Sequence, residues 1–129
     1  MATKYLIDTS ISIKYLNQTL PARGVDFIDS FINTDCTISF ISEIELQVWN
    51  PADPADIVVY QQFVSRSNII GISGEIISQT IEIRKNYKLK IADAIIAATA
   101  LSYDLTLTAD NDSDFSRIPH LKYQNPRKM

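Results

Sequence analysis

The sequence predicts an α/β domain in which a mostly parallel sheet of about five strands is covered by helices on both faces. Two observations support this fold class: short apolar segments lack the polar alternation of a half-exposed sheet, and amphipathic segments separate them. Alternation of strands and helices favours crossover connections and parallel pairing. The 129 residues contain no repeat or Gly/Ser-rich linker, so residues 1–129 are expected to form a single domain.

Five short segments are expected to be strands because they are rich in Ile, Leu, Thr and Tyr. Their length and composition are typical of strands that are buried on both faces of a parallel sheet. In chain order they are residues 4–7, 36–40, 68–72, 105–108 and 121–123.

The segments between these strands carry apolar residues at helical spacing, which predicts inward-facing stripes. The stripes are Val25, Ile28, Phe31 and Ile32; Ile41, Ile44 and Val48; Ile57, Val58, Phe63 and Val64; Ile76, Ile77, Ile81 and Ile83; and Ile91, Ile95, Ile96, Thr99 and Ala100.

Composition limits the classes of function and the cellular compartment. The net charge of −3 argues against a broadly basic nucleic-acid surface, although carboxylates gathered at one metal site would produce the same balance. Cys36 is the only cysteine, which excludes an internal disulfide; we expect it to be a small core residue rather than a nucleophile. The N-terminus lacks a signal-peptide apolar region and no segment is long enough to span a membrane, so a cytoplasmic protein is expected.

Asp8 directly follows the first predicted strand and precedes Thr9 and Ser10. Ligands of open parallel sheets bind beyond the carboxyl ends of the strands, which is where Asp8 is expected. The alternative is that Asp8 caps the next helix. More acids at the same edge would favour a site.

Glu45 is expected on the apolar face of the helix that follows the second strand. It lies four residues after Ile41 on the predicted stripe, whereas Glu43 is expected to face solvent. An unpaired buried carboxylate is costly, so Glu45 would require a cation, a donor or a proton. The alternative is a partly exposed glutamate at the margin of the stripe.

The remaining acids lie at two later junctions. Asp93 is in the first turn of an otherwise apolar helix, where it would face a pocket or simply complement the helix dipole. Asp110, Asp112 and Asp114 follow the fourth strand without the Gly and Glu of an EF-hand. Asp110 is nearest the strand end and is therefore favoured for a site, whereas Asp112 and Asp114 would also suit Asx turns.

Four carboxylates that converged at one edge would repel one another and raise each other's pKa values. Hard divalent cations relieve this repulsion because they prefer oxygen ligands. The placement of the acids is therefore compatible with a metal site.

Taken in order, these segments resemble the PIN domain and, more narrowly, the VapC-type toxins of prokaryotic toxin–antitoxin pairs. The similarity runs from Tyr5 to Pro126. It rests on Asp8-Thr9-Ser10, the Ser-x-x-Ser-x-x-Glu-Leu pattern of residues 39–46, the Asp-Ala-Ile-Ile-Ala-Ala pattern of residues 93–98, Thr108-Ala109-Asp110 with Asp114-Phe115, and the ending at residues 117–126.

The resemblance implies a three-layer α/β/α fold and a metal-dependent endoribonuclease using Mg²⁺ or Mn²⁺. It implies that Asp8, Glu45, Asp93 and Asp110 are the catalytic metal ligands. Thr9, Ser10 and Thr108 would then either donate hydrogen bonds that orient a carboxylate or a phosphate, or serve as ordinary capping residues. The resemblance also implies a cognate antitoxin and a homodimer.

Two departures from the family pattern bear on these expectations. The loop from Thr108 to Phe115 is about one residue longer than expected, which leaves open whether Asp110, Asp112 or Asp114 is the fourth ligand. Trp49-Asn50 replaces a frequent Tyr-Gly, which is expected to alter packing rather than chemistry.

A basic cluster precedes the Asp93 helix and would either track RNA phosphates or form a solvated helix end. It consists of Arg84, Lys85, Lys88 and Lys90. His120 is expected in a surface turn, and Tyr87 and Tyr103 are expected to pack rather than stack on bases.

Other α/β classes fit the sequence less well. A haloacid-dehalogenase-type phosphotransferase would place a second Asp where Ser10 stands, and a receiver domain would need an Asp within residues 69–74. A PIN-like protein that binds RNA or a partner without cleaving remains the main alternative.

Overall fold

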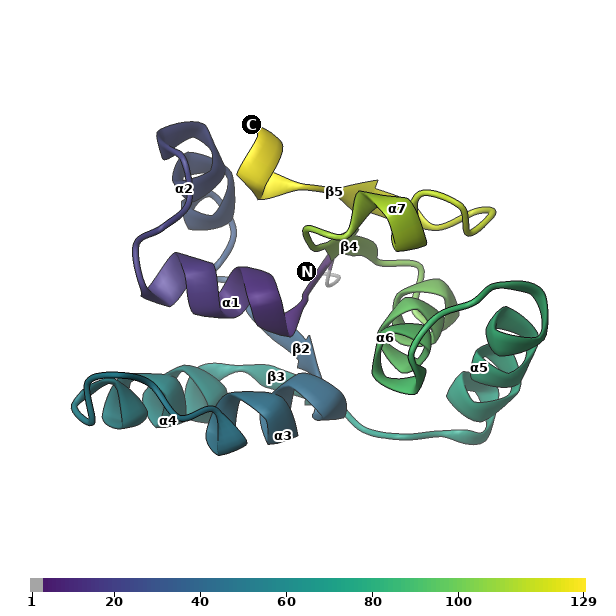
Figure 1. Cartoon of the computed structure of the whole chain (residues 1–129), viewed down its shortest axis with the longest axis horizontal. Helices are drawn as coiled ribbons and strands as arrows, with labels where there is room; N and C mark the ends of the chain where they lie inside the picture. Colours follow the sequence, from purple (N-terminus) through teal and green to yellow (C-terminus); the bar gives the residue numbers. More distant parts are fainter. Residues whose placement is uncertain (1–3) are drawn as a thin grey trace.

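The computed structural model describes residues 4–129, and Figure 1 shows their arrangement. The strands are β1 (Tyr5–Ile7), β2 (Thr37–Ser39), β3 (Asn68–Ile70), β4 (Thr106–Thr108) and β5 (Lys122–Gln124). The helices are α1 (Thr9–Leu16), α2 (Ala22–Asp29), α3 (Phe40–Val48), α4 (Asp56–Arg66), α5 (Gly74–Asn86), α6 (Ile91–Ser102) and α7 (Asp112–Phe115), followed by the 3₁₀ helix η1 (Pro126–Lys128).

All of the strand pairs are parallel, which confirms the predicted fold class. One sheet has the order β1-β4-β5 and the other pairs β2 with β3, and β2 lies beside β1. Ile7 is in register with Thr108, and Thr108 with Gln124. Because the strands are parallel and in register, the residues that follow β1 and β4 emerge at the same edge.

The two faces of β1 bury different cores, which produces the layered architecture. Leu6 packs into a cluster with residues of α5 and α6, whereas Ile7 packs into a second cluster with residues of α1, α2 and α4. Neighbouring residues of a strand point to opposite faces, so one three-residue strand supports both layers. The predicted arrangement of helices on both faces is confirmed.

The predicted stripe of α3 was only partly right, because Ile41 is partly buried against the core but the other two members are exposed. Ile44 is 53% exposed and Val48 is 73% exposed, whereas Ser42 and Leu46 are buried. Apolar residues occur on more than one side of this helix, so their periodicity does not identify the face that packs against the sheet. Glu45 lies three residues after the buried Ser42, so it is on the same side of α3 as the residues that pack against the rest of the protein.

Three other predicted stripes were only partly right. Their inward members are confirmed as buried, but several apolar side chains lie at the surface because the core uses only one part of each stripe. The surface members are Ile57 and Val58 of α4, Ile77 and Ile81 of α5, and Ile91 of α6. The α2 stripe is confirmed, with Ile28 and Phe31 buried.

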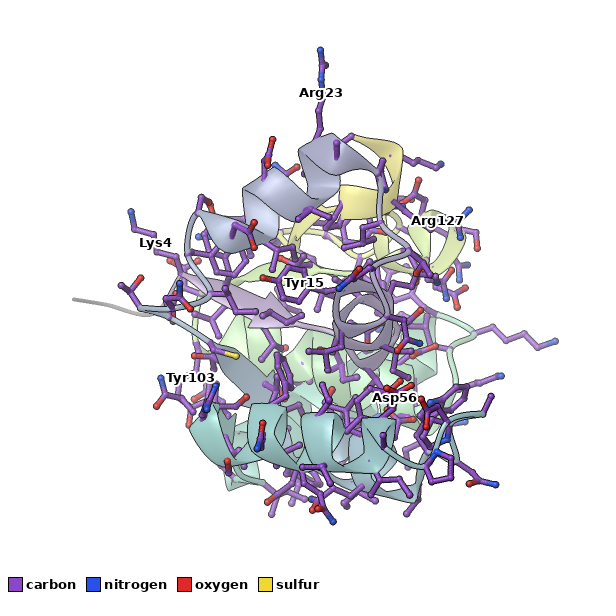
Figure 2. All side chains as sticks on the ribbon, turned by 90° about the vertical axis from the view of Figure 1, so that its left-hand side faces the viewer. Lys4, Tyr15, Arg23, Asp56, Tyr103 and Arg127 are labelled. Atoms are coloured by element: carbon purple, nitrogen blue, oxygen red, sulfur yellow. The ribbon has the colours of Figure 1, made fainter. Side chains whose placement is uncertain are left out.

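Close packing of α2 against the C-terminus positions the last charged residues of the chain. A Cβ atom on Gly24 would lie 2.2 Å from the carbonyl oxygen of Pro126, so only glycine allows η1 to approach α2 this closely. The approach brings Arg127 and Lys128 to the aspartates that follow β4. Figure 2 shows Arg127 at the C-terminal end of the chain.

Several individual predictions are settled by exposure. His120 is exposed, as expected. Tyr103 is 53% exposed, and Figure 2 shows it at the edge of the molecule, so its expected packing role was wrong. Cys36 is half-buried, and burial raises the pKa of its thiol.

The N-terminal segment in which a signal peptide would lie includes residues 1–3, which are outside the described residues. Within residues 4–129 no helix combines the length and apolarity that a membrane crossing requires.

Candidate active site

A cleft of about 440 Å³ lies at the carboxyl end of β1. It is formed where α1 follows β1 and where α3 and α6 approach, so it combines residues that are distant in sequence. Its lining is Asp8, Thr9, Ser10, Ile13, Lys14, Glu45, Trp49 and Asp93. The structure therefore brings three of the four predicted carboxylates into one cleft.

Asp8 is the most buried carboxylate of the cleft, at 7% exposed. Burial is the main reason that its pKa is raised from 3.8 to about 7, and a backbone hydrogen bond from Thr9 opposes the rise. Negative charges contribute further, in the order Asp93, Asp110 and Glu45. Asp8 is the N-cap residue of α1, but within the described residues its side chain makes no capping hydrogen bond. Capping therefore does not explain this carboxylate.

Glu45 is oriented by hydroxyl groups. The Thr9 hydroxyl donates to the Glu45 carboxylate at 2.6 Å and lies 2.8 Å from the Ser42 hydroxyl. Ser42 is fully buried, one turn before Glu45 on α3. Ser39 accepts a hydrogen bond from the Ile41 N–H at 3.1 Å, so the helix starts directly at the end of β2. The serine–threonine–glutamate contact links α1 to α3.

Asp93 lies in the first turn of α6, where the helix dipole favours a negative charge. Burial nevertheless raises its pKa, and the charges of Asp114 and Glu45 raise it further. Lys90, just before the helix, lowers the pKa in part. The position of Asp93 at the start of α6 therefore does not offset the effect of burial, and its pKa remains raised.

Asp110 lies beside the cleft and differs from the other carboxylates in having cationic partners. Its Oδ2 atom accepts hydrogen bonds from Ser10 Oγ at 3.2 Å and from Lys14 Nζ. Arg127 approaches the same oxygen at 3.7 Å. The Asp110 charge still acts on Asp8, which places Asp110 next to the other acids.

Asp112 and Asp114 occupy different surroundings from Asp110. Asp112 accepts hydrogen bonds from Tyr123 at 2.6 Å, from Asn125 at 2.9 Å and from Lys128. Asp112 therefore ties α7 to the C-terminal segment. Asp114 accepts from the Asn111 side chain at 2.8 Å, and its charge acts on Asp93. Asn111 caps α7, so the expected Asx interaction comes from this asparagine.

Thr108 ends β4 next to Asp8. Its carbonyl oxygen accepts a hydrogen bond from the Asp8 N–H at 2.9 Å, which holds the start of α1 against β4. Its side-chain hydroxyl is fully buried and has no hydrogen-bond partner among residues 4–129. The hydroxyl of Thr108 therefore orients no carboxylate within this range, and its expected accessory role toward a metal or phosphate stays a prediction.

The donor chemistry of this region fits a hard divalent cation. All of the candidate ligand atoms are carboxylate or hydroxyl oxygens, and the negative charge at Asp8 is not balanced by an ion pair among residues 4–129. In the same range of residues no three His, Cys, Asp or Glu side chains form a ready-made metal centre. Asp110 is turned toward Lys14, and Glu45 is held by Thr9. The chemistry of these oxygen ligands therefore fits a divalent metal ion, but the side chains of Asp110 and Glu45 are held by other protein groups rather than directed at a common point.

The predicted basic cluster lies outside the cleft lining. Arg84 and Lys85 lie on α5, and Lys88 and Lys90 lie in the connection to α6; all four are exposed. An electrostatic role toward RNA stays a prediction.

Sequence reasoning missed the roles of Lys14, Ser42 and Trp49, which contact or line the cleft. Lys14 could have been noticed because it lies one helical turn after Ser10. The contact of Arg127 with Asp110 depends on the packing of η1 and has no local signal in the sequence.

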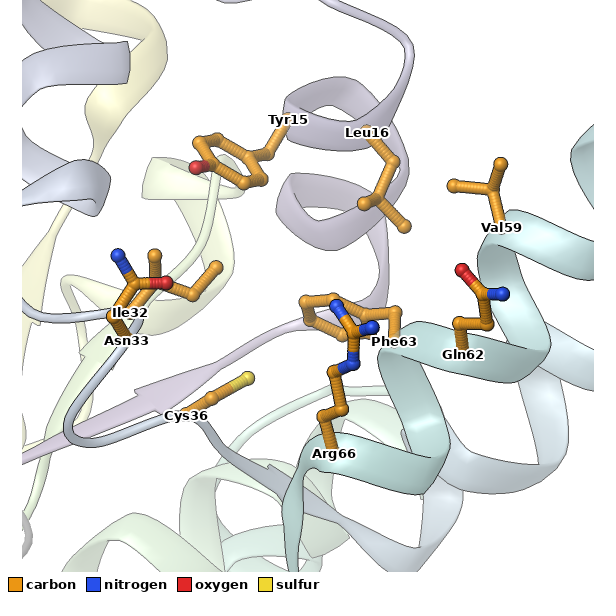
Figure 3. Close-up of a pocket in the computed structure, with 9 residues that line it drawn as sticks. All are labelled: Tyr15, Leu16, Ile32, Asn33, Cys36, Val59, Gln62, Phe63 and Arg66. Atoms are coloured by element: carbon orange, nitrogen blue, oxygen red, sulfur yellow. The ribbon is translucent and has the colours of Figure 1, made fainter.

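A second cavity, of about 280 Å³, lies between α1, α4 and the segment before β2 (Figure 3). Figure 3 shows Tyr15 and Leu16 facing Phe63 across this space, with Arg66 at its side. It contains no carboxylate in its lining, so it is chemically distinct from the acidic cleft.

Comparison with solved structures finds the same fold in toxin–antitoxin complexes. A toxin–antitoxin complex from Klebsiella pneumoniae matches with 30% identity and a TM-score of 0.76, covering 95% of this chain and 98% of that chain. VapBC2 from Rickettsia felis, bound to a promoter DNA fragment, matches with 26% identity and a TM-score of 0.78 over the same shares. DNA-bound VapBC from Salmonella typhimurium has a TM-score of 0.79 at 23% identity, over 95% and 98% of the two chains.

No curated protein matches the chain. The family description that matches is the PIN domain, over residues 5–121. This range contains β1, β2, β4 and every carboxylate discussed above, and it agrees with the family resemblance of the sequence motifs. The chain therefore belongs to the PIN domain family.

Proposed function

We propose that this protein is a metal-dependent endoribonuclease and the toxin of a type II toxin–antitoxin system. PIN domains of the VapC family are nucleases and in general depend on divalent metals, which supports the reaction class. The observation that carries the proposal is the buried Asp8 carboxylate among Glu45, Asp93 and Asp110 at the end of the sheet.

In this proposal Asp8, Glu45, Asp93 and Asp110 hold the metal. When bound, Mg²⁺ or Mn²⁺ supplies Lewis acidity toward the phosphate and activates water. Thr9 holds Glu45 in one orientation, and Ser10 does the same for Asp110. The hydroxyl of the buried Ser42 forms a hydrogen bond with the Thr9 hydroxyl and so helps to fix its position.

Asp112 and Asp114 are assigned supporting roles in the proposal. Asp112 already accepts three hydrogen bonds that are shared between both of its oxygens, whereas the donors to Asp110 among residues 4–129 all lie at its Oδ2 atom. Asp114 acts on Asp93 through its charge and fixes the start of α7 through Asn111. This division favours Asp110 as the fourth ligand.

The RNA is proposed to reach the cleft along its open side. Trp49 lines the cleft and is half-exposed, which suits contact with a base or ribose. The cluster of Arg84, Lys85, Lys88 and Lys90 is exposed and precedes α6, the helix that carries Asp93. Steering by such a cluster would offset the overall negative charge.

The toxin assignment includes a cognate antitoxin, a homodimer and a cytoplasmic location. The similar structures named above include toxin–antitoxin complexes, which supports a protein partner. The surface of this chain also carries apolar side chains that association would cover, among them Val48, Ile57 and Ile81. The apolar part of the second cavity is a further surface of this kind.

The proposal is tested by RNA cleavage with Mg²⁺ or Mn²⁺, with EDTA as the metal-free condition. Asp8→Asn and Asp93→Asn are each expected to lower kcat/KM by about 10²-fold or more, because each removes a charged metal ligand. Glu45→Gln and Glu43→Gln form a matched pair on one helix, and only the first is expected to reduce cleavage. Cleavage that resists EDTA, or that survives both aspartate substitutions, would overturn the assignment.

The second candidate function is RNA or partner binding without cleavage. It is favoured by one observation, the Lys14 contact that occupies Asp110. A protein of this kind would bind RNA with equal affinity in Mg²⁺ and EDTA and leave the RNA intact.

Expression with and without the neighbouring reading frame would separate a toxin from a housekeeping nuclease, because only a toxin should arrest growth.

A further inference from the structure

Among the four proposed ligands, Asp110 alone is held by cationic side chains within residues 4–129. Lys14 Nζ and Ser10 Oγ both donate to its Oδ2 atom, and Arg127 approaches the same atom at 3.7 Å. The Asp110 side chain is 10% exposed and that of Lys14 is 31% exposed. This ion pair is therefore more shielded than an ordinary surface pair.

The Lys14 contact is built into α1. Ser10 and Lys14 are one helical turn apart, and Lys14 Nζ donates to Ser10 Oγ at 2.9 Å. The same hydroxyl donates to Asp110 at 3.2 Å. Lys14, Ser10 and Asp110 thus form a closed triangle that joins α1 to the residue after β4.

A carboxylate oxygen that already accepts from an ammonium and a hydroxyl has little lone-pair capacity left for a metal ion. A divalent ion binding at this oxygen must displace the lysine or share its charge at close range, and both cost free energy. Resting on the proposed function, we propose that Lys14 is an internal cation that competes with the divalent metal for Asp110 and thereby weakens metal binding.

Lys14 is a positioning residue in this proposal, because it acts on the metal through Asp110. In the absence of the ion it keeps Asp110 turned toward α1 and balances its charge. When the ion takes Asp110, the ammonium is released at the wall of the cleft, which Lys14 lines. Metal occupancy and the position of this lysine are therefore linked.

The test uses the only tryptophan of the chain, Trp49, which lines the same cleft. Paramagnetic Mn²⁺ bound nearby quenches its fluorescence, so a Mn²⁺ titration gives the metal affinity without any cleavage assay. Lys14→Gln is expected to bind Mn²⁺ about fivefold more tightly than the wild type, because the competing charge is gone. Lys14→Arg keeps the charge and is expected to retain the weaker, wild-type affinity.

Lys90→Gln is the matched control. It removes the same type of side chain beside another proposed ligand, Asp93, whose pKa Lys90 lowers, yet it has no contact with Asp110. Competition at Asp110 predicts a clearly smaller gain of affinity for Lys90→Gln than for Lys14→Gln. An equal or larger gain of Mn²⁺ affinity for Lys90→Gln would mean that the bound metal responds only to the total positive charge near the cleft, and it would overturn the proposal.

The two proposals fail in different ways. If the wild type binds Mn²⁺ and Lys14→Gln binds it no more tightly, the role of Lys14 is refuted and the metal site stands. If neither protein binds Mn²⁺, both the metal site and the role of Lys14 are refuted. Binding by Lys14→Gln alone would support the competition in its strongest form.

Discussion

Asp8 and Asp112 are two aspartates that follow neighbouring parallel strands, yet their surroundings have opposite effects. Burial raises the pKa of Asp8 to about 7, and neighbouring carboxylates add to the rise. Hydrogen bonds hold the pKa of Asp112 well below its usual range, with that from Lys128 the strongest cause and those from Tyr123 and Asn125 next.

The comparison separates a carboxylate available to a ligand from one that is already used by the protein. Asp112 is ionised, supplied with donors and committed to holding the C-terminal segment. Among residues 4–129, a backbone hydrogen bond alone offsets the burial of Asp8, so a cation would stabilise its charged form. Position at the edge of the sheet brings an acid near a site, and the surrounding donors determine what it does there.

The largest expected effect is the difference in RNA cleavage between the Asp8→Asn and Asp112→Asn variants. Asp8→Asn is expected to lower kcat/KM by about 10²-fold or more, as argued above, because the charged ligand is lost. Asp112→Asn should leave the value near that of the wild type. Steady-state cleavage of one RNA by purified variants measures both, and a collapse of activity in Asp112→Asn alone would reverse the assignment of the two residues.

The second effect concerns the stability of the metal-free protein as a function of pH. The pKa of Asp8 is about 7 when folded and 3.8 as the ordinary value. Below pH 3.8 the group is protonated in both states; between the two values the folded protein binds more protons. Its contribution to the free energy of unfolding is therefore lost as the pH rises through this window, by about 4 kcal/mol in total.

Denaturant unfolding in EDTA at several pH values measures this loss. The difference between the wild type and Asp8→Asn isolates the contribution of Asp8, because the amide does not titrate. The variant should gain stability relative to the wild type from pH 4 to pH 7. A constant difference over this range would show that Asp8 is ionised in the folded protein without strain.

Much of the cleft could be predicted from local sequence and one rule of topology. Asp8 follows a strand, Glu45 lies one turn into the helix after a strand, and Asp93 is in the first turn of a helix. Parallel strands place such positions at the same edge of the sheet. This rule led to the correct grouping of Asp8, Glu45 and Asp93, whose metal role stays a prediction.

The face of a helix with apolar residues on several sides could not be predicted in the same way. Ile44 and Val48 satisfy the period of a helix as well as Ser42 and Leu46 do, and only the second pair is buried. The small buried Ser42 allows Thr9 to approach and orient Glu45. The tertiary contact with α1 therefore decides the packed face.

Which of Asp110, Asp112 and Asp114 faces the other acids, and which holds the C-terminal segment, also could not be predicted from the local sequence. It depends on donors from Lys14 at one end of the chain and Lys128 at the other. The close approach of Gly24 to Pro126 positions the second donor. Contacts between residues this far apart are products of the fold and carry no spacing signal.

A third, smaller effect is expected for the stability of Asp112→Asn. The folded pKa of Asp112 is lowered, so its contribution to stability is present above the ordinary value of 3.8 and is lost as the pH falls. The substitution should lower the Tm at pH 7 by a few degrees, and this difference from the wild type should shrink progressively as the pH falls below 3.8 toward the lowered folded pKa. Thermal unfolding followed by circular dichroism measures this, and an unchanged Tm at pH 7 would remove the structural role of Asp112.

The smallest effect is expected for Tyr123→Phe, which removes one of the three donors to Asp112 and leaves the ring in place. The lost hydrogen bond spans 2.6 Å, and the ring still packs against Phe115, whose centroid lies 5.9 Å away. Two donors remain on Asp112, so the Tm should fall less than in Asp112→Asn, and Mn²⁺ binding at the cleft should be unchanged. If Tyr123→Phe weakened Mn²⁺ binding, Asp112 would belong to the metal site, and the separation between the two aspartates would not hold.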